Sequence, residues 1–138
     1  MSYDINTLKG ELTGFEEAGV IFKKLYSAES ALINLVFPDI ILTAFACEIA
    51  IKGIFYLDKG QEIKGQHGLK DLFARLDVCI QNDIKNSIQD FDQLLEQTKD
   101  VFVDWRYLYE NTGQKTVCIN FLDGFLKALH AKLYSYSS

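Results

Sequence analysis

The densest group of chemically capable side chains lies in residues 104–111, which read Asp-Trp-Arg-Tyr-Leu-Tyr-Glu-Asn. A fixed cation, three aromatic rings, two carboxylates and an amide fall within about two helical turns. Arg106 is permanently charged, and its fork of N–H donors matches a phosphate or a carboxylate. The Thr-Gly step that follows Asn111 indicates a helix end next to a loop, where binding sites are often built. The sequence therefore predicts an anion-binding site centred on Arg106, with Tyr107, Glu110 and Asn111 beside it.

The same spacing also fits a purely structural role. An arginine in the last turn of a helix complements the helix dipole, and Glu110 lies four residues later, where a surface pair contributes about 0.3–0.5 kcal/mol. The rings of Trp105, Tyr107 and Tyr109 could stack on bases. Trp105 and Tyr109 also fall on the apolar face of the expected helix, where rings usually belong to a core or an interface. Both interpretations stay open on these residues alone.

Glu48 is the second residue of chemical interest, because it lies in a helix that is apolar nearly all round. A carboxylate buried there needs a partner. Lys52 follows one turn later, in the favoured order for an i,i+4 pair. The alternative is that Glu48 reaches Arg106 and holds the guanidinium in place, and the two contacts are compatible.

These residues need helices to position them, and hydrophobic periodicity with a single proline predicts an all-α protein. We expect one domain, residues 1–138, folded as an up-and-down bundle of about five helices. Pro38 separates the first helix from the second. A capping box is expected at Thr13 and Glu16, an N-cap at Thr116, and a turn over residues 77–85. The expected helices are residues 11–36, 39–57, 68–76, 87–110 and 117–136.

Composition narrows the function classes. A net charge of -5 argues against a broad basic nucleic-acid surface, although a local cationic site remains compatible with it. The spacing of Cys47, Cys79 and Cys118 suggests core residues, with neither disulfides nor zinc.

The N-terminus lacks a signal-peptide pattern, so a cytoplasmic location is expected. The apolar run 40–57 is interrupted by polar residues and is interpreted as a buried helix, not a membrane span. No metal or cofactor motif is present, and we expect neither.

Three segments carry a family resemblance. Residues 106–111 resemble the HEPN signature, an arginine, an apolar or aromatic residue, three variable positions and a histidine, with Asn111 in the histidine position. Residues 46–52 resemble the glutamate-plus-lysine second helix of many HEPN proteins. Residues 66–72 resemble their Gly-His-x-Leu-x-x-Leu third helix. With the helix order, the resemblance covers roughly residues 39–133 and implies a HEPN-like helical domain.

In active members of the family, arginine and histidine face each other across a dimer cleft and cleave RNA without metal. Asn111 has no pKa near neutrality, and loss of a positioned acid–base group typically costs about 10²–10⁴-fold in rate. His67 is expected to make a local hydrogen bond at a helix start, and His130 to face solvent. Neither histidine is assigned a catalytic role.

The resulting hypothesis is a homodimeric, catalytically degenerate binding module that holds RNA, a nucleotide or an antitoxin-like protein partner at Arg106, away from membranes. Family context suggests bacterial toxin–antitoxin or phage-defence systems. One alternative is a metal-independent endoribonuclease that uses Arg106 with non-histidine partners. Another is a purely structural interaction bundle.

Overall fold

The computed structural model describes residues 4–29, 35–66, 68–99 and 114–136. Within these ranges the chain forms six helices and no strand, which confirms the all-α prediction. The helices are α1 (Ile5–Ala28), α2 (Val36–Lys59), α3 (Leu69–Ala74), α4 (Val78–Lys85), α5 (Phe91–Thr98) and α7 (Gln114–Ser135).

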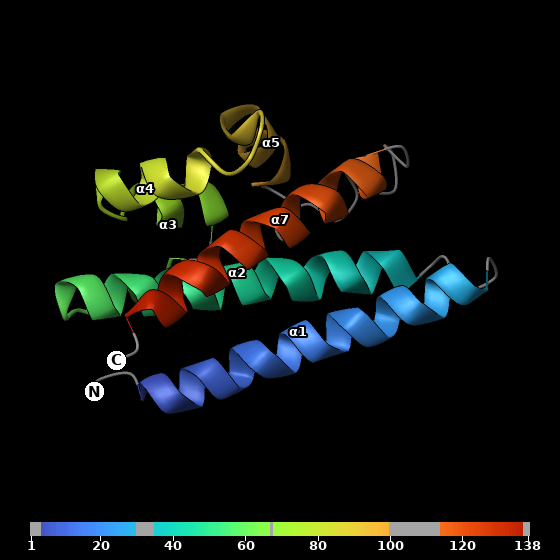
Figure 1. Ribbon diagram of the computed structural model, residues 1–138, viewed down its shortest axis with the longest axis horizontal. Coiled ribbons are helices and arrows are strands. Elements are labelled where there is room, and N and C mark those ends of the chain that lie inside the picture. Colours follow the sequence, from blue (N-terminus) through green and yellow to red (C-terminus); the bar gives the residue numbers. More distant parts are fainter. Residues whose placement is uncertain (1–3, 30–34, 67, 100–113, 137–138) are drawn as a thin grey trace.

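The three long helices form the frame of the bundle, and α2 lies at its centre (Figure 1). Both α1 and α7 pack closely along α2, whereas α1 and α7 pack only sparsely on each other. The short helices α3, α4 and α5 gather on the side of the molecule opposite α1 (Figure 1). The segment Pro38–Lys59 is long and apolar enough to cross a membrane by composition, with a mean hydropathy of 1.9. A helix at the centre of a helical core passes the same test of length and hydropathy. Of the most apolar stretch of this segment, 61% is buried within the fold.

The start of α1 is set by Asp4. Its carboxylate accepts hydrogen bonds from the backbone N–H groups of Asn6 (3.0 Å) and Thr7 (3.3 Å). These are two of the N–H groups that an uncapped helix leaves without partners. The expected start near residue 11 and the expected capping box at Thr13 and Glu16 are therefore wrong, because both residues lie inside α1. The apolar periodicity marked the buried face but not the polar first turn.

The central helix α2 begins just before Pro38 and ends at Gly60. Pro38 is the third residue of α2, in the first turn, where its missing N–H costs nothing. Gly60 adopts a left-handed backbone (φ 71°), and its N–H donates to the Tyr56 carbonyl at 2.8 Å. The predicted boundary at Pro38 is wrong: α1 ends at Ala28, α2 begins at Val36, and Pro38 lies inside α2 because the first turn of a helix tolerates proline. Helix α2 extends a few residues beyond each expected end.

The short helices differ most from expectation. Residues 78–85 form α4 instead of a turn, because the Asp77 carboxylate caps it by accepting from the Cys79 N–H at 3.2 Å. Helix α5 begins at Phe91 and not at residue 87, after Asp90 takes a left-handed conformation (φ 58°) that aspartate tolerates. The later part of the expected helix 87–110, from residue 100 on, lies outside the described residues.

Helix α7 carries the apolar face that the sequence predicted. Phe121, Leu122, Phe125, Leu126, Leu129 and Leu133 are all buried. Phe125 packs edge-on against Phe73 of α3 (5.6 Å between centroids) and Phe91 of α5 (5.2 Å), which joins the short helices to the long ones. The helix begins at Gln114, so the expected N-cap at Thr116 is wrong.

The structure describes the side chains of two of the three cysteines, and these test the prediction that the cysteines are core residues. Cys47 is buried in α2, where its thiol contacts the Leu122 carbonyl (3.8 Å) and burial raises its pKa. Cys79 is exposed on α4, so its assignment to the core is wrong. The Cys118 side chain lies outside the described part of the chain.

Candidate functional site

The structure describes only some of the residues that were predicted to form the anion site. Arg106, Tyr107, Glu110 and Asn111 lie outside the described residues, as does His67. Glu48 and Lys52 are described, and both lie on α2 with a distance of 3.8 Å between Lys52 Nζ and Glu48 Oε2. Their side chains are only 11% and 15% exposed, so the pair is largely withdrawn from water on the central helix.

A second polar cluster, which the sequence interpretation did not assign, surrounds Asp39 in the first turn of α2. The residue is 0% exposed. Its carboxylate accepts from Lys23 Nζ of α1 at 3.0 and 2.8 Å and from the Tyr26 hydroxyl at 2.8 Å. Thr43, one turn further along α2, donates to it at 3.3 Å. Four donor contacts, two of them from the Lys23 ammonium, offset the cost of removing this charge from water.

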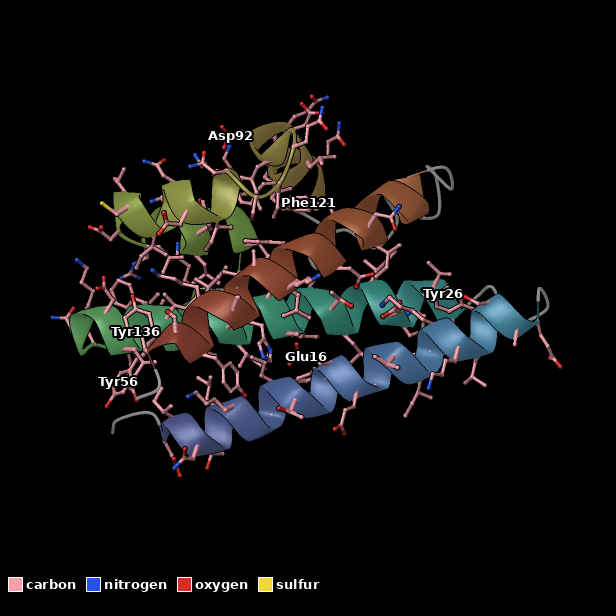
Figure 2. The ribbon with its side chains drawn as sticks, in the orientation of Figure 1. Glu16, Tyr26, Tyr56, Asp92, Phe121 and Tyr136 are labelled. Atoms are coloured by element: carbon pink, nitrogen blue, oxygen red, sulfur yellow. The ribbon has the colours of Figure 1, made fainter. Side chains whose placement is uncertain are left out.

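Tyr26 is held in its neutral form by the same environment. Burial, followed by the hydrogen bond to Asp39 and the nearby negative charge, raises the pKa of the hydroxyl. The phenol therefore remains a donor at neutral pH. Its position on α1, three residues after Lys23, places both donors on the side that faces α2; Figure 2 shows Tyr26 near the N-terminal end of α2.

Lys23 also connects α1 to α7. Its ammonium lies 3.1 Å from Asp123 Oδ1, in addition to its two contacts with Asp39. The pKa of Asp123 is raised, because partial burial disfavours its charge more than the nearby Lys23 favours it, and Asp39 adds a like charge. Asp123 is therefore a carboxylate whose negative charge is incompletely compensated.

Gly19 allows the two helices to approach here. A Cβ at this position would lie 3.2 Å from Asp39 Oδ1 and 3.7 Å from Lys23 Nζ. The contact with Asp39 is tighter than ordinary van der Waals contact. The glycine thus leaves room for the lysine–aspartate network between α1 and α2.

A second bridge joins α1 to α7 two turns away. Glu16 lies within 3.0 and 2.9 Å of His130 Nδ1, and the imidazole stacks on Tyr134 with 4.3 Å between ring centroids. A carboxylate only accepts, so Nδ1 carries the proton. His130 is partly exposed to solvent, as expected, with 38% of its side chain accessible, but it is also held by a partner on another helix, which the sequence did not indicate.

Between the two bridges lies a cavity of about 500 Å³. Its volume is in the range of small-molecule sites, which typically measure about 300–1,000 Å³. Figure 2 shows Glu16 on the side of α1 that faces the other long helices. The lining residues come from α1 (Phe15, Glu16, Gly19, Val20, Lys23), α2 (Thr43) and α7 (Asp123, Leu126, Lys127, His130, Ala131).

One feature of the sequence indicates the polar cluster around Asp39. Asp39 belongs to the most apolar helix of the chain, and the argument applied to Glu48, that a buried carboxylate needs partners, applies equally to it. In the sequence, Asp39 is the first residue of the expected helix 39–57, directly after Pro38, and an acidic residue is common at such a position. The partners on α1 and α7 are far away in sequence, and periodicity alone does not pair them.

Among the described residues, no group of three His, Cys, Asp or Glu side chains is placed to hold a metal ion. A scan of protein-family models, a search of curated proteins and a search of solved structures each found no match to this chain. The HEPN-like assignment therefore stays a prediction from the sequence.

Proposed function

We propose that this chain is a HEPN-like binding module that holds an anion at Arg106 and does not cleave RNA efficiently. The anion is a phosphate group of RNA or of a nucleotide, or a carboxylate of a protein partner. The module would act in a bacterial toxin–antitoxin or defence system.

One structural observation supports this proposal above the others. The glutamate and lysine that the family resemblance assigns to the second helix, Glu48 and Lys52, lie together on the central helix and are largely buried. Charged groups in such a position are costly to bury and are retained where they have a task or a compensating partner. The absence of a proton-transferring histidine at position 111 favours recognition over cleavage.

The test compares binding and cleavage in the same preparation. Fluorescence anisotropy with labelled single-stranded RNA and with a labelled adenine nucleotide is expected to show binding to one of them, and Arg106→Ala is expected to weaken it at least about tenfold. Arg75→Ala is the matched control, since Arg75 is the other arginine of the chain and lies on the Phe55 ring (5.2 Å), next to α3. It removes the same charge from a residue that is not assigned to the proposed site.

The same samples separate the alternatives. Degradation of labelled RNA in EDTA by the wild type but not by Arg106→Ala would establish the ribonuclease and overturn the binding-module proposal. Binding of neither probe, with no cleavage, would leave a structural interaction bundle as the correct assignment.

We also propose that the module is a homodimer. Large apolar side chains of α1 and α2 are exposed, among them Ile21 (58%), Leu25 (43%) and Phe45 (41%). Ile21 and Leu25 lie one turn apart on α1, on the same side as Gly14 and Ala18, which line an apolar groove with Leu42 and Ile49 of α2. A contiguous apolar face of this kind is typical of a protein–protein contact.

A further inference from the structure

The cavity between α1 and α7 has a simple construction. Both helices line it with residues spaced three or four apart, and both span seven residues between the two bridges, from Glu16 to Lys23 and from Asp123 to His130. Seven residues of α-helix rise roughly 10 Å. The cavity is therefore about two turns long, with an ionic bridge at each end.

The donors at the Lys23 end are already used. An ammonium group has three N–H donors, and Lys23 makes three contacts, two with Asp39 and one with Asp123. The hydroxyls of Tyr26 and Thr43 also donate to Asp39. Asp123 contacts Lys23 through Oδ1 and its side chain is 37% exposed, so this carboxylate has acceptor positions left for a ligand.

The opposite end also presents an acceptor. Glu16 receives one N–H, from His130 Nδ1, whereas a carboxylate offers about four lone-pair positions. Its side chain is 27% exposed and lines the cavity. Each end of the cavity therefore offers a carboxylate with spare acceptor capacity, and the wall between them is apolar, formed by Phe15, Val20 and Leu126.

Unused acceptor positions at the two ends favour a cationic ligand over an anionic one. The lining carries two carboxylates, Glu16 and Asp123, and two ammonium groups, Lys23 and Lys127, beside the His130 imidazole. The buried Asp39 carboxylate takes two of the three donors of Lys23. Lys127 is the cation that an anion would use, but its side chain is exposed and it lies between the two ends of the cavity.

We propose that this cavity binds an aliphatic diamine, with one ammonium group at Asp123, the other at Glu16, and the hydrocarbon chain against the apolar wall. The site is separate from Arg106 and does not depend on the proposed anion binding. Because Lys23 keeps both of its contacts with Asp39, an Asp123→Asn variant retains the network that joins α1 to α2.

Calorimetric titration of the full chain tests the proposal with three probes of equal chain length. Cadaverine is expected to bind, pentylamine to bind at least about tenfold more weakly, and glutarate not to bind. Asp123→Asn and Glu16→Gln are each expected to weaken cadaverine binding about tenfold or more and to reduce its advantage over pentylamine. Asp71→Asn on α3 removes the same charge elsewhere and is expected to leave the titration unchanged. Circular dichroism establishes that each variant is folded.

The outcomes decide between ligand classes. Tighter binding of glutarate than of cadaverine would assign the cavity to an anion held by Lys127 and His130 and would overturn the proposal. Equal binding of cadaverine and pentylamine would reject the two-ended site. Absence of cadaverine binding, or binding that survives both substitutions, would show that the cavity is not an amine site.

Discussion

At the scale of single residues, the two carboxylates around Lys23 have different roles. Asp39 is fully buried and accepts four hydrogen-bond contacts, so its charge is well compensated. Asp123 is partly exposed and contacts Lys23 through one oxygen only, and its pKa is raised. A carboxylate that the fold leaves incompletely compensated is a cost to stability, and such costs concentrate at binding sites.

This difference predicts a pH-dependent effect of Asp123→Asn. Because the folded-state pKa of Asp123 lies above its ordinary value of 3.8, ionisation of this group lowers stability as pH rises from that value through the raised one. Asparagine resembles the protonated carboxyl. The variant is therefore expected to match the wild type near about pH 3.5 and to be slightly more stable at about pH 7.

Urea denaturation at both pH values measures the effect. Asp71→Asn, exposed on α3, serves as the control for the loss of one negative charge, and the comparison between the two variants removes the contribution of net charge. A variant that is less stable than the wild type at neutral pH would mean that attraction to Lys23 outweighs burial.

Residue types alone identified part of the chemistry. The need of Glu48 for a partner followed from its apolar helix, and Lys52 as one of two candidate partners followed from helical spacing. The contact between Glu16 and His130 did not, because the two residues are more than a hundred positions apart and no local rule brings them together. Arg106, the residue on which most of the functional interpretation depends, can be tested only by experiment.

At the scale of helices, the prediction was right for helices with a long apolar face. It was wrong about helix starts that polar capping residues determine. The long helices α1, α2 and α7 follow from their periodicity. The starts of α1 and α4 depend on Asp4 and Asp77, whose carboxylates accept from backbone N–H groups at the helix N-termini. Such caps contribute only about 0.5–2 kcal/mol each, and many aspartates in a sequence are not caps.

Helix packing gives a second prediction, at Gly53. This glycine lies where α2 passes between α1 and α7, and an added Cβ would meet Leu8 Cδ2 at 2.9 Å and Leu133 Cδ1 at 3.1 Å. Gly10 of α1 has no atom within 4 Å of such a Cβ and is its matched control. Alanine raises helix propensity by about 1 kcal/mol at either position, whereas overpacking a core costs about 1–3 kcal/mol.

Chemical denaturation is therefore expected to show Gly10→Ala as more stable than the wild type, and Gly53→Ala as less stable than Gly10→Ala by about 1–3 kcal/mol. The difference between the variants isolates packing, because the propensity gain is common to both. Equal stability would mean that Leu8 and Leu133 move apart without cost and that the contact between the three long helices is loose.

At the scale of the whole molecule, the all-α architecture follows from composition and periodicity, but the arrangement of the helices does not. The sequence marked α2 as central because it is apolar nearly all round, and both other long helices pack on it. It gave no indication that α1 and α7 would stand apart with a cavity between them. Two polar bridges, Lys23 with Asp123 and Glu16 with His130, span that separation.

The proposed dimer is also a property of the whole surface, and it gives the last prediction. Ile21 is 58% exposed beside Leu25 and the apolar groove, whereas Val78 is 65% exposed on α4, away from α1 (Figure 1). Burying a charge at an apolar interface is strongly unfavourable. Light scattering after size exclusion is expected to show a dimer for the wild type and for Val78→Glu, and a monomer for Ile21→Glu at the same micromolar concentration. A monomeric wild type would reject the dimer, and a dimeric Ile21→Glu would place its contact on a face that does not include α1.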